Sequence, residues 1–351
     1  MSALPLNAAS LVEAPEDLDE LIEFFHLRRW SDGLPIVPPT RERVQRMLTG
    51  SRRQAHEVVA RVAPGFGEAT VERIAINAVM AGCRVDHLPV LIAATEAISD
   101  KSFNLQGIQA TTNPVAVWLI INGPLALQLE VNSGMNCLGQ GSVANATLGR
   151  ALRLIMQNIG GALPGDMDRA TQGQPGKFSF CCAENEAQSP WLPLQVDRGF
   201  APTQSTVTVV GAAGTHNMNS HAKDADDLIR VVADTMAFPT SNDYWISGEP
   251  WIVIGPEHAQ ILHAAGLTKA EVKQRLWQAS GLSAKRMAKV EFQRTHTARC
   301  EELGAIDLDS SLPISSHADG VGIVVAGGPG THSVYVPSFG DTRAVTRLIE
   351  S

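Results

Sequence analysis

Residues 209–217 read "VVGAAGTHN", and residues 324–333 read "VVAGGPGTHS". Each stretch has two valines, then a turn of small residues, then Gly-Thr-His and a small polar residue. A continuous apolar run that ends in glycine is typical of a buried strand entering a tight turn. The repeat therefore predicts two equivalent strand-to-loop corners of one parallel sheet, with His216 and His332 facing a common ligand.

A third strand of the same kind lies between the two copies of the repeat. Residues 250–262 read "PWIVIGPEHAQIL", an apolar run that leads through Gly-Pro into a helix beginning at His258. Strand, turn and helix in alternation predict an α/β fold. We expect a mixed two-lobe protein, in which residues 1–199 form a mostly helical lobe with substrate loops. Residues 200–351 then form an α/β lobe on a mainly parallel sheet with glycine-rich strand-end turns.

The N-terminal half contains helices with recognisable ends. Thr40 and Thr70 are side chains that cap a helix N-terminus, and Gly82 is a residue type that ends one. Between the first two helices, "SDGLPIVPPT" is held extended by its prolines, either as a clamp on a site or as a rigid connector. Periodic apolar residues predict helices over residues 15–30, 41–48, 71–81, 88–98 and 143–161, and an apolar run predicts a buried strand over residues 117–124.

Composition narrows the class of protein. The chain has 351 residues, 44% of them hydrophobic, and a net charge of −8 without a cluster of lysines and arginines. We therefore expect neither disorder nor a nucleic-acid partner. No apolar run approaches the roughly 20 residues of a membrane span, and the N-terminus lacks a basic start followed by an apolar run, so neither a membrane partner nor a secretory signal is expected. Five cysteines without a CxxC spacing indicate reduced thiols in a cytoplasmic protein.

The stretch "AGCRVDH", residues 81–87, gathers a thiol, a guanidinium, a carboxylate and an imidazole just after a predicted helix. Such groups make an activated nucleophile or a general base. The C-terminal end of a helix dipole does not lower a thiol pKa, so His87 rather than Cys83 is the catalytic candidate. The alternative is a buried thiol beside a structural contact between Asp86 and His87.

The stretch "GKFSFCCAENEAQSPW", residues 176–191, places two carboxylates beside aromatic residues. On an extended segment Glu184 and Glu186 share one face, and Asn185 points away from it. Paired carboxylates shift each other's pKa, which provides a proton donor and a proton acceptor. They equally suit a divalent metal, or a hydrogen-bonded scaffold without catalytic function. Cys181 and Cys182, being adjacent, are interpreted as core thiols.

Two polar loops are candidates for substrate binding. Residues 136–150, "NCLGQGSVANATLGR", place glycines before a helix N-terminus, where an anion is favoured. Residues 109–114, "QATTNP", form a hydroxyl-rich loop. Capping and turn chemistry is the alternative for both. The substrate-binding candidates from all motifs are Thr111, Thr112, Asn145, Arg150, Lys177, Asn185, Gly214 and Gly330.

Four stretches together, "DGLPIVPPT", "AGCRVDHLPV", "ANATLGRALRL" and "GKFSFCCAENEAQSPW", resemble a bacterial family related to the UGSC-type (seleno)proteins. The resemblance implies a soluble bacterial protein. Its UGSC relatives carry a selenocysteine or cysteine pair in a glycine-rich segment, which implies thiol redox chemistry. The comparable turn here has Thr331, His332 and Ser333 instead, with no cysteine nearby.

We therefore expect an enzyme that carries out acid/base chemistry, of hydrolase or lyase type, on a small polar and anionic substrate in a cleft between the lobes. The catalytic candidates are His87, Glu184, Glu186, His216 and His332. A thiol-dependent oxidoreductase and a non-catalytic binding protein or assembly subunit are the alternative functions. A divalent-metal cofactor and a homo-oligomeric state are left open.

Overall fold

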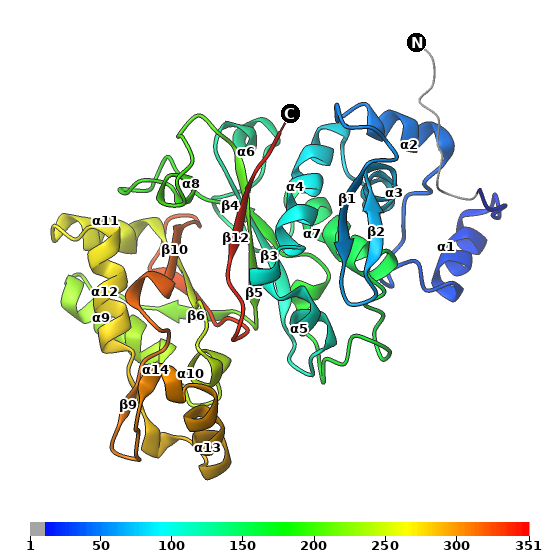
Figure 1. The fold of residues 1–351 in the computed structure, drawn as a ribbon. Helices are drawn as coiled ribbons and strands as arrows, with labels where there is room; N and C mark the ends of the chain where they lie inside the picture. Colours follow the sequence, from blue (N-terminus) through cyan, green and yellow to red (C-terminus); the bar gives the residue numbers. More distant parts are fainter. Residues whose placement is uncertain (1–10, 351) are drawn as a thin grey trace.

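The computed structural model describes residues 11–350, of an α/β protein that is 40% helix and 16% strand. Two four-stranded mixed sheets pack face to face, and helices cover the outer face of each (Figure 1). The expectation that the N-terminus carries no secretory signal concerns a stretch that begins in residues 1–10. These residues lie outside the described part of the chain.

The first sheet combines strands from both halves of the chain, in the order β12-β5-β3-β4. Only β3 and β4 are parallel neighbours; β5 runs antiparallel to both β3 and β12. This sheet therefore contains strands from both sides of the predicted lobe boundary at residues 199 and 200: β3 and β4 precede it, and β5 and β12 follow it. Its strands are β3 (Ala116–Asn122), β4 (Cys181–Ala183), β5 (Thr206–Ala212) and β12 (Val345–Leu348).

The second sheet has the order β10-β7-β11-β6. Strands β10 and β7 are parallel, whereas β11 is antiparallel to β7 and to β6. The expectation of a mainly parallel sheet is thus wrong, because two of the three strand pairings are antiparallel: β11 runs against its neighbours β7 and β6, which share the direction of β10. The strands are β6 (His216–Asn219), β7 (Trp251–Ile254), β10 (Gly322–Val325) and β11 (His332–Val336).

The two Gly-Thr-His turns are not corners of one parallel sheet. One follows β5 in the first sheet, and the other follows β10 in the second sheet. Each turn instead leads into one of two strands, β6 and β11, that pair with each other. The repeated sequence thus delivers two chain segments into one antiparallel ladder.

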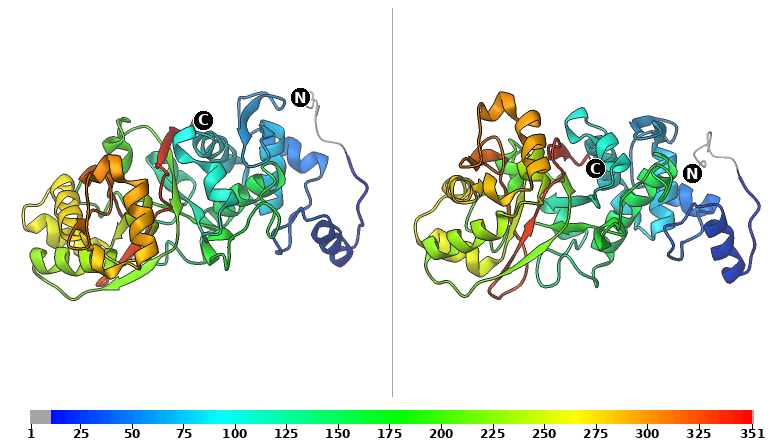
Figure 2. Two further views of the ribbon diagram at one scale, coloured as in Figure 1. Left: turned by 60° about the horizontal axis from the view of Figure 1, so that its bottom comes forward. Right: turned by 90° about the horizontal axis from the view of Figure 1, so that it is seen from below.

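The interior has three layers of apolar contact. Between the sheets, Trp118 of β3 packs edge-on against Trp251 of β7, with ring centroids 6.0 Å apart. Alternate residues of the same strands face outward. The first sheet is covered by α4 (Leu88–Ile98) and α7 (Val143–Asn158), against which α3 (Val71–Ala81) packs, and the second by α9 (Ala225–Met236), α11 (Pro256–Ala264) and α12 (Lys269–Ala279). These two helical layers stand at opposite ends in both views of Figure 2.

Several helices begin or end at the capping residues that the sequence predicts. The Thr40 and Thr70 hydroxyls accept hydrogen bonds from the first turns of α2 (Arg41–Leu48) and α3, and Gly82 ends α3 with φ +86°. Helix α1 (Leu18–Leu27) begins later than expected, because the Asp17 carboxylate accepts from the Asp19 and Glu20 N–H groups. Other helices are α5 (Leu105–Ala110), α6 (Pro124–Gln128), α8 (Leu194–Asp197), α10 (Asn242–Ile246), α13 (Lys289–Ala298) and α14 (Cys300–Leu303).

Two small antiparallel strand pairs complete the described chain. They are formed by β1 (Val58–Val62) with β2 (Gly67–Thr70) and by β8 (Leu282–Ser283) with β9 (Ser311–Leu312). None of the helices in residues 11–350 has the length and apolar content needed to cross a bilayer.

Candidate functional site

A cavity of about 370 Å³ carries the densest set of charged side chains among the cavities described here. One wall is the segment after α1, another is α7, and the third is the loop between α7 and β4. Its polar lining residues are His26, Arg29, Ser31, Asp32, Arg153, Gln157, Asp168 and Lys177. All of them precede residue 200, so this cavity does not lie between the two predicted lobes.

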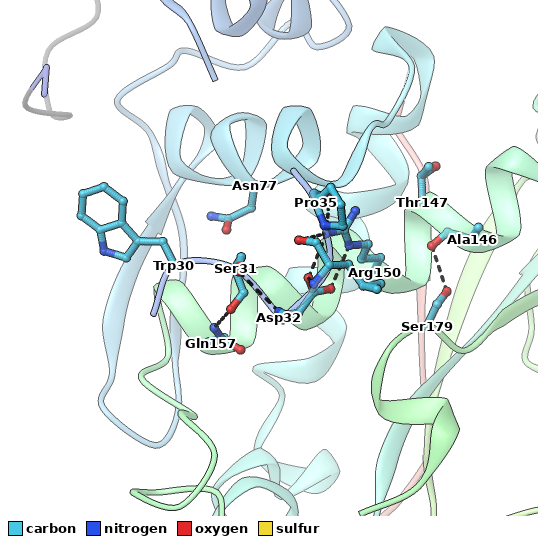
Figure 3. A network of polar contacts seen from close by, with 12 residues as sticks. Trp30, Ser31, Asp32, Pro35, Asn77, Ala146, Thr147, Arg150, Gln157 and Ser179 are labelled. Carbon is cyan, nitrogen blue, oxygen red and sulfur yellow. Dashed lines mark hydrogen bonds and ion pairs between the residues drawn. The ribbon is translucent and has the colours of Figure 1, made fainter. Parts of the chain in front are cut away.

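The first wall is a strap, residues 29–35, that α7 holds by side-chain contacts. Arg150 forms a bidentate ion pair with the Asp32 carboxylate, with both N···O distances 2.8 Å. Its guanidinium also donates to the Leu34 and Pro35 carbonyl groups. Gln157 donates to the carbonyl groups of Arg29 and Ser31. Figure 3 shows both interactions on one face of the helix. The strap is thus fixed to α7 along its length.

A buried ion cluster forms the opposite wall. The Lys177 ammonium lies 2.8 Å from both carboxylate oxygens of Asp168, and Arg153 lies 3.4 Å from one of them. Arg153 also donates to the Ala162 carbonyl at 2.7 Å. Burial lowers the pKa of Lys177 and of Arg153, and the Asp168 charge opposes both shifts. Lys177 is therefore a lysine with an increased neutral fraction, positioned on a cavity.

The charges around the cavity do not cancel. Its lining has three basic side chains, Arg29, Arg153 and Lys177, against the two carboxylates Asp32 and Asp168. The Asp32 carboxylate is already paired with Arg150 outside the cavity. A net positive cavity in a chain of net charge −8 is suited to an anionic ligand.

Two predicted binding residues belong to this site. Lys177 lines the cavity, and Arg150 positions its strap without lining it. Asn145 has a structural role, since its amide bonds the backbone of Asn132 and Cys137. Thr111 caps a turn by accepting from the Asn113 N–H.

Three further binding candidates lie in loops away from this cavity. The Thr112 carbonyl accepts from Thr171. The Gly330 N–H donates to the Glu257 carboxylate at 2.8 Å, with φ +139°, a conformation that favours glycine. Gly214 is half-buried, with open space where a side chain would begin.

The Glu184-Asn185-Glu186 segment follows β4 at the carboxyl ends of the parallel strands β3 and β4. The Glu184 carboxylate is buried and accepts from Asn122 and from the Leu194 N–H, both at 2.7 Å. Its Oε1 has no hydrogen-bond partner, and burial raises its pKa. Glu186 accepts from the Gly123 N–H at 2.7 Å. These bonds match the scaffold alternative, and neither glutamate lines the charged cavity.

The same segment joins the two sheets. The Asn185 N–H donates to the Val325 carbonyl at 2.7 Å, and the Asn185 amide donates to the Gly327 carbonyl. The Gly327 N–H in turn donates to the Ser133 carbonyl. The segment after β4, the glycine-rich turn after β10 and the backbone at Ser133 therefore meet near the ends of β4 and β10.

His87 is fully buried before α4, where its Nδ1 accepts from the Arg84 N–H and lies 3.4 Å from the Thr147 hydroxyl. Burial lowers its pKa to about 4, Arg84 lowers it further, and Asp86 opposes the change. Burial also raises the pKa of Cys83 to about 12. The thiol is therefore not activated, in agreement with the dipole argument.

His216 and His332 lie on opposite faces of the second sheet. His216 is the register partner of Tyr335, whereas His332 is the partner of Asn219. Because adjacent residues of a strand point to opposite faces, the faces of Tyr335 and His332 differ. Both histidines are exposed, and His332 contacts the Asn217 side chain at 3.2 Å. The hypothesis that both rings face one ligand is therefore wrong.

Two cysteines, Cys137 of the loop before α7 and Cys182 of β4, belong to the same apolar layer between the sheets. Both thiols are buried, and they lie close enough to shift each other's pKa. The Cys182 thiol and the N–H groups of Cys137, Leu138 and Gly327 lower the pKa of Cys137. The neighbouring Cys137 thiol and burial raise the pKa of Cys182. No local pattern marks this pair, because its members are 45 residues apart in the chain.

Several residues of the charged cavity escaped sequence reasoning. Arg153 stands between leucines on an otherwise apolar helix, and Asp168 lies in a loop without a recognisable motif. The available signal was the spacing of Arg150, Arg153 and Gln157, which recur at three and four residues and so share one helix face.

Within residues 11–350, no group of three histidine, cysteine, aspartate or glutamate side chains is arranged to hold a metal ion. No family model matches the chain, and comparisons with curated proteins and with solved structures gave no significant match.

Proposed function

We propose that the protein is an enzyme acting by acid/base chemistry on a small polar anion bound in the charged cavity. The observation that carries the proposal is Lys177: an ammonium group of lowered pKa, held on Asp168, at the wall of a net positive cavity. Lysines of lowered pKa serve as general bases near neutral pH. Arg29 and Arg153 then bind the anion, and Lys177 moves the proton.

The size of the cavity supports a small substrate. Ligand sites generally span about 300–1,000 Å³, and this one is at the lower end with about 370 Å³. Its polar lining favours a carboxylate or phosphate over an apolar compound. Either a hydrolase or a lyase reaction is compatible with a lysine base, and the proposal names the class of substrate rather than one compound.

The test combines anion binding with lysine reactivity. Inorganic phosphate, malonate and succinate are titrated calorimetrically into the protein, and at least one is expected to bind. Lys177→Met and Arg29→Met should each weaken binding about ten-fold or more. The matched control Lys101→Met removes an exposed lysine outside the cavity and should leave binding unchanged.

Trinitrobenzenesulfonate labelling at pH 8 tests the proton-transfer role. Lys177 should react faster than the exposed Lys101, because more of its amine is neutral, and the bound anion should slow the reaction. The proposal fails if none of the three anions binds, or if Lys177 is not labelled faster in the absence of an anion.

A second candidate, a thiol-dependent oxidoreductase, is favoured by the proximity of Cys137 and Cys182. The reaction we propose uses a hydroperoxide as oxidant. The Cys137 thiolate attacks the peroxide, forming a sulfenic acid and releasing an alcohol or water. The Cys182 thiol then displaces water from the sulfenic acid, and a disulfide forms.

Mass spectrometry after treatment with hydrogen peroxide tests this candidate. A Cys137–Cys182 disulfide should form, and Cys137→Ser should prevent oxidation of Cys182. The exposed Cys300 provides the internal control for unspecific oxidation. Oxidation of Cys300 alone would contradict the candidate. All five cysteines are unpaired in the described residues, which supports a cytoplasmic location as part of the proposal.

A further inference from the structure

A second cavity, of about 440 Å³, lies on the other side of the strap and is mainly apolar. Helix α1 contributes Phe24 and Phe25, α3 contributes Ile76 and Met80, and the strap contributes Trp30. The three aromatic rings pack edge-to-face, with centroids 5.8 to 6.2 Å apart. Figure 3 shows the Trp30 ring pointing away from the Asp32–Arg150 ion pair. This cavity therefore offers an aromatic and aliphatic wall to a ligand.

A buried carboxylate also lines this cavity. Glu72, in the first turn of α3, is 1% exposed, and its Oε2 has no hydrogen-bond partner. No ion pair joins Glu72 to a cation within residues 11–350. A buried carboxylate without a counter-charge is costly, and a ligand that brings a positive charge relieves that cost.

A second unpaired acceptor, on Asn158, also favours a ligand that donates hydrogen bonds. Asn158 lines the cavity and donates to the Trp30 carbonyl at 3.0 Å and to the Asn77 side chain at 2.8 Å. Its own Oδ1 is buried without a partner. The unpaired atoms of Glu72 and Asn158 are both acceptors, so the ligand that completes them must donate hydrogen bonds.

The arginines of the lining do not complete these acceptors. Arg73 donates instead to the Glu68 carbonyl at 2.8 Å, toward the β1–β2 pair. Arg41 is exposed at the start of α2. Neither guanidinium makes a hydrogen bond to Glu72 or Asn158 in the described chain.

We propose that this cavity binds a primary organic ammonium ion with an aromatic or branched aliphatic body. The ammonium group, with three N–H donors, meets the Glu72 carboxylate and the Asn158 carbonyl oxygen. The apolar body packs against Phe24, Trp30 and Ile76. The site shares no lining residue with the charged cavity and does not depend on the function proposed for it.

Calorimetric titration with three matched probes tests the proposal. 2-Phenylethylamine should bind, whereas 2-phenylethanol should bind about ten-fold more weakly and 3-phenylpropionate not measurably. Equal binding of the amine and the alcohol, or preference for the carboxylate, overturns the proposal. This comparison uses the unaltered protein, so it does not depend on the folding of any variant.

Two variants locate the binding site. Glu72→Gln should weaken amine binding about ten-fold or more without affecting the alcohol, and the control Glu23→Gln, exposed on α1, should change neither. Ile76→Trp fills the cavity and should abolish binding of the amine and the alcohol, with an unchanged circular dichroism spectrum. Amine binding that survives both Glu72→Gln and Ile76→Trp would show that the amine binds elsewhere, and the proposal would be withdrawn.

Discussion

His87 shows how burial decides the role of a single residue. A ring that is fully buried, with Nδ1 accepting a backbone hydrogen bond, is held neutral near pH 7. It positions the turn between α3 and α4, and it is not exposed to a substrate. The cluster "AGCRVDH" therefore forms a packed corner in which Arg84 reaches out to Glu130 and the Leu129 carbonyl.

The lowered pKa of His87 predicts a pH dependence of stability. The unfolded chain binds a proton near pH 6.5, but the folded chain binds one only near pH 4. Stability is therefore fully present above pH 6.5 and is lost as the pH falls through this window, by about 3 kcal/mol. Urea unfolding of the wild type and of His87→Asn, at pH 7 and pH 4, measures it. The loss on acidification should be about 3 kcal/mol smaller in the variant.

Other buried groups titrate in the same window, so the difference between the two proteins is the quantity that matters. Burial raises the pKa of Asp243 to about 6, which has the opposite effect on the pH dependence. This contribution is the same in both proteins and cancels. Identical slopes for wild type and His87→Asn would mean that His87 is protonated as easily in the folded protein as in the unfolded chain.

At the scale of elements, α7 is the helix that organises the N-terminal half. Its apolar face packs on the first sheet, and its polar face holds the strap through Arg150, Gln157 and Asn158. Pro35 in the strap, with Pro38 and Pro39 just after it, favours an extended chain, which leaves the carbonyl groups of the strap free to accept from these side chains. The contacts show that "SDGLPIVPPT" is an ordered segment held on α7, and its role as a clamp on a site stays a prediction.

The Arg150–Asp32 ion pair should contribute strongly to stability, because both side chains are largely buried. Arg150→Met is expected to lower the free energy of unfolding by about 3 kcal/mol, since it leaves the Asp32 charge unpaired. The matched control is Arg230→Met, which breaks an exposed pair with Asp227 and should cost no more than about 1 kcal/mol. Denaturant unfolding measures both values, and equal costs would show that the strap is not held by Arg150.

Elements with local signals were predictable from sequence, and elements without them were not. The Thr268–Glu271 capping box of α12 is present with both of its hydrogen bonds. The β3 run is buried along its entire length, as a continuous apolar segment predicts. The ion cluster at Asp168 was not predictable, because a loop carboxylate and two cations come together only after α7 has packed.

At the scale of the whole molecule, strand order was the part that sequence patterns could not supply. An apolar run identifies a strand but not its neighbours or its direction. The pairing of β12 with β5 joins residues 345–348 to residues 206–209, and no local pattern marks that contact. Consequently the α/β class was confirmed, whereas the mainly parallel sheet and the shared histidine site were wrong.

The strap has a consequence for how the molecule responds to ligands. Trp30 lines the apolar cavity, and its neighbours Arg29 and Ser31 line the charged cavity. A single peptide segment therefore contributes to both proposed ligand sites. If a ligand in one cavity shifts the strap, the binding free energy of a ligand in the other cavity changes. Thermodynamic reciprocity then requires an anion to change the affinity for an amine by the same factor that the amine changes the affinity for the anion. If both proposed ligands bind, such coupling through the strap would make the occupancy of each cavity depend on the concentrations of both ligands.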